Sequence, residues 1–202
     1  MITSLCKKST QAINLFARKK EGKINKMKAI KLIYFADRYH IRKYGRPIIG
    51  DSYWAMKLGP VGSETLNTAN LSKKDLDASC LKYAQEFLGH PKGDIKLQNI
   101  ISKKEVDLGV FSQTDIEALE ATFNEFGDKD QFELADESHK YPEWLKHEKE
   151  INKGRKRVKM EYSDFFNNSL PEESSIFKYS DEHLGLMKDV YEEDLDIQKA
   201  IG

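Results

Sequence analysis

The sequence lacks the long apolar run and the leader segment that direct a chain into or across a membrane. No stretch approaches the ~18 consecutive apolar residues of a membrane-spanning helix. Met1–Leu5 are followed by polar and basic residues, whereas a signal peptide continues with an apolar core. We therefore expect a cytoplasmic protein with no membrane partner.

Cysteine is scarce, and neither sign of charge is in excess. Cys6 and Cys80 have no metal-ligand spacing and no framework of further partners, which predicts free thiols in a reducing compartment. The 33 basic and 33 acidic residues cancel, so no overall field attracts the chain to nucleic acid. Hydrophobic residues make up 39% of the 202, which is enough for one core, or for one domain with an appendage.

The segment from Asn25 to Gly62 contains the most informative pattern. Between residues 28 and 44 a helix would be apolar almost all the way round, through Ala29, Ile30, Leu32, Ile33, Tyr34, Phe35, Ala36, Tyr39, Ile41 and Tyr44. A helix that is apolar on every side is surrounded by other elements. The sequence thus predicts a central buried helix, with Asn25 as its N-cap and Gly45-Arg46-Pro47 as its end.

Periodicity, caps and turn residues predict the other elements. Helices are expected over 3–20, 61–70, 72–88, 112–127, 130–138 and 181–201, with a further one beginning at Pro142. Strands are expected over 53–57, 95–101 and 105–110, the last two pairing as a hairpin through 102–104. The fold class is α+β, mainly α-helical: a central buried helix, a small antiparallel sheet and surrounding helices.

The chain changes character near its C-terminal end. The basic run 153–159 has three possible roles: a solvated linker, a contact with nucleic acid phosphates, or an autoinhibitory contact with Glu172-Glu173 or the acidic helix over 181–201. The first is favoured, because the run has no interleaved aromatic residues. The acidic helix is amphipathic and is expected to dock on another surface through Leu184, Met187, Val190, Tyr191 and Ile197.

Two groups of residues are candidates for chemistry. Asp37 and His40 share one face of the central helix, either as a catalytic or metal-binding pair or as a buried polar pair that satisfies itself and the Arg46 region. Two ligands do not complete a structural zinc site, so the second interpretation is favoured and no metal is expected. His139 is expected to bond backbone at a helix end while Trp144 packs. A hydrolase using Asp37, His40 and His139 is kept as a minor alternative.

The strand candidate and the turn after it form the best candidate binding surface. Alternation places Tyr53 and Trp54 on opposite faces, so that one aromatic ring faces the core and the other is exposed, although both could be core. Exposed aromatic residues beside Lys or Arg often anchor protein interfaces. The predicted contact residues are Tyr53, Trp54, Lys57, Pro60 and Arg46.

These motifs together resemble the Panacea domain, also called the SocA-like or GepA-like antitoxin domain. The resemblance rests on a Lys-Leu-apolar-Tyr-Phe-Ala helix, an aromatic-His turn, a Tyr-Gly-x-Pro exit and a Gly-Pro-Val turn, here Lys31, Leu32, Tyr34, Phe35, Ala36, Asp37, Tyr39, His40, Tyr44, Gly45, Pro47, Gly59, Pro60 and Val61. It continues through Ser138-His139, Pro142 and Trp144, with Ser138 where the family usually has Thr and Leu58 where it more often has Tyr. It spans roughly residues 8 to 167.

The resemblance implies a non-enzymatic antitoxin of bacteria, phages or mobile elements, with a role such as phage defence. It would need no cofactor and would bind a cognate toxin protein encoded next to it. It divides the chain into a Panacea-like domain over 1–167 and an acidic amphipathic C-terminal helical extension over 168–202. The alternative is a protease adaptor, or a regulatory protein of a phage or mobile element that presents a partner for degradation or binds DNA.

Overall fold

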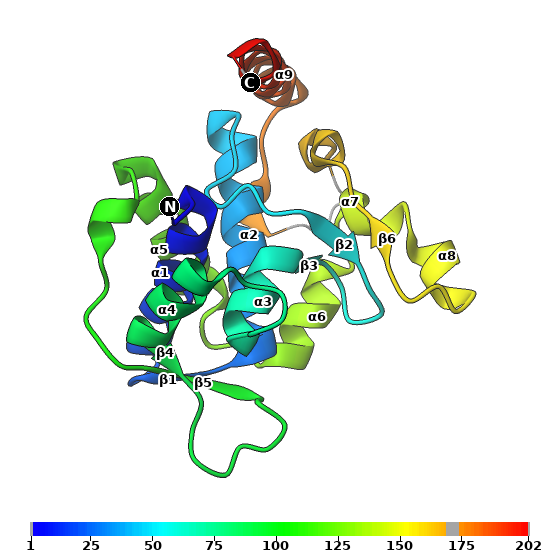
Figure 1. Cartoon of the computed structure of the whole chain (residues 1–202). Helices are drawn as coiled ribbons and strands as arrows, with labels where there is room; N and C mark the ends of the chain where they lie inside the picture. Colours follow the sequence, from blue (N-terminus) through cyan, green and yellow to red (C-terminus); the bar gives the residue numbers. More distant parts are fainter. Residues whose placement is uncertain (1, 169–173, 202) are drawn as a thin grey trace.

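A computed structural model describes residues 2–168 and 174–201 of the chain, and its centre is helix α2 (Lys26–Tyr44) (Figure 1). The Asn25 side chain accepts a hydrogen bond from the Lys28 amide, and Gly45 ends the helix in the left-handed region at φ 72°. Every residue from 29 to 42 is buried. The predicted central helix and both of its caps are therefore confirmed.

The other helices pack around α2 or flank it. They are α1 (Ser4–Lys19), α3 (Ser63–Asn70), α4 (Ala78–Phe87), α5 (Gln113–Phe126), α6 (Gln131–Ser138), α7 (Pro142–Leu145), α8 (Glu148–Asn152) and α9 (Asp181–Ile201), with 3-10 turns η1 (Leu108–Val110), η2 (Tyr162–Phe166) and η3 (Ser175–Phe177). Helices α5, α6 and α9 contact α2 directly. At the α2–α5 contact the rings of Phe35 and Phe126 lie 4.6 Å apart, centroid to centroid.

Two small antiparallel sheets lie outside this helical layer. One has the order β1 (Lys23–Asn25), β5 (Asn99–Ser102), β4 (Leu88–Gly89), and the other has the order β3 (Val61–Gly62), β2 (Tyr53–Ala55), β6 (Val158–Lys159). The mainly helical α+β class is confirmed. The prediction of a hairpin between 95–101 and 105–110 is wrong. Strand β5 pairs with β1 and β4, and Leu108–Val110 forms a 3-10 turn. A short apolar run does not specify its partner strand.

Side-chain caps decide where two of the helices begin. Ser112 and Asp115 form the expected capping box at the start of α5. The helix expected from residue 72 begins only at Ala78, because Asp77 accepts hydrogen bonds from the Ser79 and Cys80 amides. None of the helices in the described residues combines the length and the mean hydropathy of a membrane span.

Cys6 and Cys80 form a disulfide, so the prediction of free thiols is wrong. The two residues are 74 positions apart in the sequence, and a separation of that size carries no information about pairing. Packing of α4 against α1 brings their Cα atoms to 6.0 Å. Because the two cysteines are paired, they no longer support the expectation of a reducing compartment.

Helix α9 docks on the C-terminal end of α2. Leu184 is buried, and the imidazole Nε2 of His183 donates to the Arg42 carbonyl oxygen at 2.9 Å. The buried Arg42 guanidinium donates in turn to the carbonyl oxygens of Phe165 and Phe177. One side chain of α2 thereby holds the two 3-10 turns that precede α9.

Candidate functional site

The β2–β3 hairpin presents one aromatic residue to the core and the other to its outer side. The Tyr53 side chain is buried, and its hydroxyl donates to Asp37 Oδ2 at 2.9 Å. Trp54 is half-buried on the opposite face, under the Arg157 guanidinium, which lies 4.5 Å from the ring centroid. The alternation is confirmed. Tyr53 is unavailable to a partner, however, so its assignment to the contact surface is corrected.

Side chains from α2 and from the α6–α7 region hold the turn after β2 from below. Lys31 Nζ donates to the Pro60 carbonyl oxygen at 2.8 Å, and Trp144 Nε1 donates to the Met56 carbonyl oxygen at 3.0 Å. Gly59 has φ +88°, and a Cβ at this position would overlap Ser138 Oγ and Lys31 Nζ. Pro60 is buried in this packing, so it too is removed from the predicted contact surface.

Burial changes the proton affinity of the groups beneath the turn. It lowers the pKa of Lys31 to about 7. It also lowers the pKa of His139, and the nearby Lys31 charge acts in the same direction. The His139 ring stacks on Trp144 with centroids 3.9 Å apart, and within the described residues its Nε2 has no hydrogen-bond partner. The backbone amide of His139 caps α6 as expected, but its imidazole packs instead of bonding.

Asp37 and His40 are both buried and His40 contacts the Arg46 region, as expected, but the prediction that the two side chains pair with each other is wrong. Asp37 Oδ1 accepts from the amides of Ile48 and Ile49 at 2.8 and 2.9 Å, and burial raises the pKa of Asp37 to about 7. His40 Nδ1 donates to the Arg46 carbonyl oxygen at 2.6 Å. Both side chains fold the segment after α2 back onto the helix, which is a structural role.

A buried ion pair links α2 to α7, and the sequence analysis missed it. Arg38 Nη1 lies 2.7 Å from Glu143 Oε2, both side chains are fully buried, and the Tyr34 hydroxyl donates to Glu143 Oε1 at 2.5 Å. The sequence signal for Arg38 was its charge on a helix that is otherwise apolar on every side. No sequence signal identified its partner Glu143, which is 105 residues away. Tyr34 and Phe35 are thus core residues of the motif.

The remaining predicted contact residues do not form one patch. Arg46 lies past the C-terminal end of α2, where its guanidinium contacts Asp115 at 2.9 Å and Ser112 Oγ at 3.0 Å. Lys57 lies in the β2–β3 turn, beside residues of the N-terminal half of α2. Trp54 and Lys57 therefore remain together in the candidate surface, and Arg46 belongs to a different part of the molecule.

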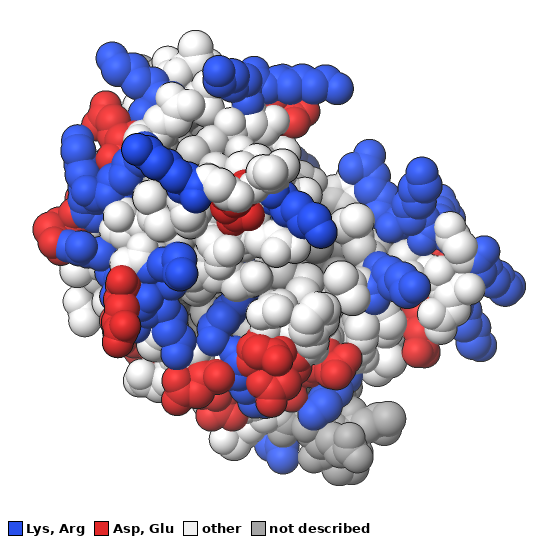
Figure 2. All heavy atoms as spheres, turned by 90° about the horizontal axis from the view of Figure 1, so that it is seen from below, with Lys and Arg blue, Asp and Glu red and all other residues white. Residues whose placement is uncertain are grey.

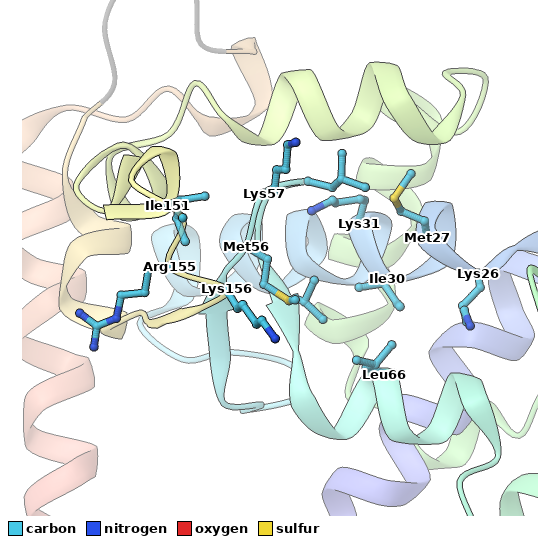
Figure 3. Close-up of a pocket in the computed structure, with 13 residues that line it drawn as sticks. Lys26, Met27, Ile30, Lys31, Met56, Lys57, Leu66, Ile151, Arg155 and Lys156 are labelled. Carbon is cyan, nitrogen blue, oxygen red and sulfur yellow. The ribbon is translucent and has the colours of Figure 1, made fainter. Parts of the chain in front are cut away.

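Beside this turn is a groove of about 660 Å³ (Figure 3). Its walls come from the start of α2, the β2–β3 hairpin, α3, α8 and the segment between α8 and β6. The lining residues are Lys26, Met27, Ile30, Lys31, Met56, Lys57, Leu58, Val61, Leu66, Ile151, Gly154, Arg155 and Lys156. None of them is acidic or aromatic. The groove therefore has an apolar interior and a border of Lys and Arg side chains.

Residues 153–157 of the basic run are exposed, as expected of a solvated segment, but the run as a whole is more than a linker. Ala55 pairs with Val158 and Trp54 with Lys159, so the run ends as strand β6 of the second sheet. Figure 2 shows basic side chains gathered over the α8–β6 region, on the right of that view. Glu172 and Glu173, the expected acidic partners of the run, lie outside the described residues.

The site contains no arrangement typical of a metal centre. Among the described residues, no group of three or more His, Cys, Asp or Glu side chains is placed to hold a metal ion. Four residues of the motif, Asp37, His40, Gly59 and Trp144, hold the turn and the segment that leads to it. The surface they support is the groove and the outer side of the hairpin.

Comparison with known proteins gives one result. No curated protein and no solved structure matches the chain significantly. Residues 30–145, from within α2 to the end of α7, match the family model described as antitoxin SocA-like, Panacea domain. This range contains the buried helix, the hairpin and the His139–Trp144 stack. The chain belongs to the SocA-like antitoxin family and carries its Panacea domain.

Proposed function

We propose that this protein is an antitoxin that neutralises a cognate protein toxin by binding it directly, in the cytoplasm of a bacterium. Membership of the SocA-like antitoxin family carries this proposal. Binding alone is sufficient for such a role, because covering the toxin's active site prevents access of its target. The activity then requires no cofactor and no catalytic residue of this chain.

The groove and the outer face of the β2–β3 hairpin form the binding surface in this proposal. Trp54 is half-buried and Lys57 exposed, so both remain accessible beside the groove. Aromatic, methionine and cationic side chains are typical of interface centres. Beneath them, the Lys31–Pro60 and Trp144–Met56 hydrogen bonds hold the turn in one conformation. A preorganised surface loses less conformational entropy on binding.

Co-expression tests the proposal. Each open reading frame next to this one is expressed from an inducible promoter, alone and together with this protein, and growth is measured. We expect one neighbour to arrest growth and this protein to restore it, with the two proteins co-purifying. The proposal fails if no neighbour is toxic, or if toxicity is unchanged when this protein is present.

A second experiment separates binding from folding. Trp54→Ala and Lys57→Glu alter the proposed surface, whereas Ile33→Asp places an unpaired charge in the core of α2. We expect the first two variants to keep the far-ultraviolet circular dichroism of the wild type and to lose neutralisation. Ile33→Asp is expected to lose both. Equal unfolding of all three variants would mean that the hairpin serves only as core.

A further inference from the structure

The groove has an apolar interior that is open at the protein surface. Met27, Val61 and Leu66 are half-buried, Leu58 is 46% exposed, and Ile30 is the buried apolar residue contributed by α2. These residues come from three separate elements, α2, the β2–β3 hairpin and α3, and they face the same space. An exposed apolar surface that is concave and rimmed by polar groups is typical of an interaction site.

The rim of the groove is cationic. It contains Lys26, Lys57, Arg155 and Lys156. Lys26 bonds to Asn70 Oδ1, and Arg155 is ion-paired with Glu150. In the described part of the chain, no hydrogen bond or ion pair engages the ammonium of Lys57 or Lys156. In Figure 3 Met56 lies between these two lysines. Two uncompensated positive charges therefore border the apolar space.

We propose that this groove binds an acidic amphipathic segment of the toxin, an inference that rests on the proposed function. The apolar side chains of that segment fill the groove, and its carboxylates pair with Lys57 and Lys156. A segment bound in this way buries its apolar face in the groove and places its charged edges at the rim. A basic segment is disfavoured, since like charges brought together at an interface weaken binding.

The lining favours a peptide over nucleic acid. Single-stranded nucleic acid is held by aromatic rings on which bases stack, together with cations along the backbone. The groove offers cations but no aromatic lining residue, and its interior is aliphatic side chains and methionine. The nearby Trp54 ring is stacked under Arg157 on the outer face of the hairpin. The chemistry of the groove matches carboxylates combined with aliphatic side chains.

The test compares charge reversal at the groove with the same reversal elsewhere. Lys57→Glu/Lys156→Glu changes the net charge by as much as Lys73→Glu/Lys74→Glu, a pair of exposed lysines outside the groove. The probe is the purified toxin that passes the co-expression test, and the dissociation constant is measured at low and at high salt. We expect the groove pair to weaken binding about tenfold or more, chiefly at low salt. The control pair is expected to bind within about threefold of the wild type.

A second pair of variants, at apolar residues, tests the apolar part of the groove. Leu58→Glu introduces a carboxylate at the groove, and Ile95→Glu introduces one at a residue that is 94% exposed elsewhere. Neither substitution buries a charge, so both proteins are expected to fold. We expect only Leu58→Glu to weaken toxin binding. A photo-crosslinking amino acid at residue 58 then identifies the bound segment by mass spectrometry.

The outcomes separate this inference from the proposed function. If the wild-type protein neutralises no neighbour, the proposed function fails. If it neutralises a toxin but the groove variants bind as the controls do, the groove inference is overturned while the function stands. Crosslinking to a toxin segment that carries both carboxylates and apolar residues supports the inference. Crosslinking to a segment without Asp or Glu, or to a second copy of this chain, overturns it.

Discussion

Three polar residues of α2 hold the chain that follows the helix. Lys31 donates to the Pro60 carbonyl oxygen, Asp37 accepts from the Ile48 and Ile49 amides, and His40 donates to the Arg46 carbonyl oxygen. The bonds of Lys31 and Asp37 satisfy buried backbone groups that would otherwise be costly, and the bond of His40 satisfies a part-buried one. The polar residues of this apolar helix therefore decide the path of the segment that ends in the β2–β3 turn.

Lys31→Met is expected to flatten the pH dependence of stability. The pKa of Lys31 in the folded protein is lowered to about 7 from 10.5, so between these values the unfolded chain binds more protons. Stability of the wild type therefore rises with pH in this range, by at most about 1.4 kcal/mol per pH unit. Methionine has no such proton, and the variant loses this rise.

Urea unfolding at pH 7, 8 and 9 measures the effect, below the range in which tyrosines ionise. Lys73→Met, at an exposed position, is the matched control and should keep the slope of the wild type. A Lys31→Met variant with an unchanged slope would show that Lys31 is not the group responsible.

Gly59→Ala is expected to cost more stability than the same change at Gly22. Both glycines have φ +88°, so the backbone penalty of about 1–2 kcal/mol for an L-residue is shared. At Gly22 nothing lies within 4 Å of the added Cβ, whereas at Gly59 it meets Ser138 Oγ and Lys31 Nζ. Chemical denaturation of the two variants isolates the steric contribution. Equal losses would mean that the turn can move away from α2.

At the scale of elements, the sequence specified the helices far better than the strands. Helices α2 and α5 carry their own caps and periodicity within one stretch of chain. Strands β1, β4 and β6 have two or three residues each, and they exist only because distant segments meet, as when Ala55 pairs with Val158. The groove was missed for the same reason. Its walls, such as Met27, Leu58 and Ile151, come from segments that are far apart in the sequence.

The Cys6–Cys80 bond makes stability depend on redox conditions. It joins α1 to α4 across 74 residues, and cross-links of that kind typically contribute about 2–4 kcal/mol. We expect a reductant to lower the unfolding free energy of the wild type by that amount, which appears as a lower urea midpoint, and to leave the midpoint of Cys6→Ala/Cys80→Ala unchanged. Wild-type unfolding curves that are identical with and without reductant would contradict the contribution of the bond.

Helix α9 offers a matched pair of leucines that tests how it is docked. Leu184 is 3% exposed and Leu186 is 57% exposed, two positions apart on the same helix. Leu184→Ala is expected to cost about 2–3 kcal/mol of unfolding free energy, because it removes a buried side chain from a helix that packs against α2 and η2. Leu186→Ala should stay within about 0.5 kcal/mol of the wild type. Similar small effects at both positions would mean that α9 is not held against α2.

At the scale of the whole molecule, helix α2 contributes both to the core and to the proposed binding groove. The N-terminal half of α2 lines the groove through Met27 and Ile30, while its other faces form the core. The unfolded chain has no groove, so a toxin that binds there binds the folded state alone. Linkage then requires the toxin to stabilise this protein, by about 2.7 kcal/mol when its free concentration is a hundred times the dissociation constant.

Thermal unfolding with and without the toxin measures this linkage. We expect the transition of the wild type and of Lys73→Glu/Lys74→Glu to move to higher temperature as toxin is added. At the same toxin concentration the shift should be smaller for Lys57→Glu/Lys156→Glu, because its dissociation constant is larger. Ile33→Asp is expected to show no transition at all, since it does not fold. Equal shifts in the two charge-reversed proteins would place the toxin on a face other than the groove, because both variants share the same fold and net charge.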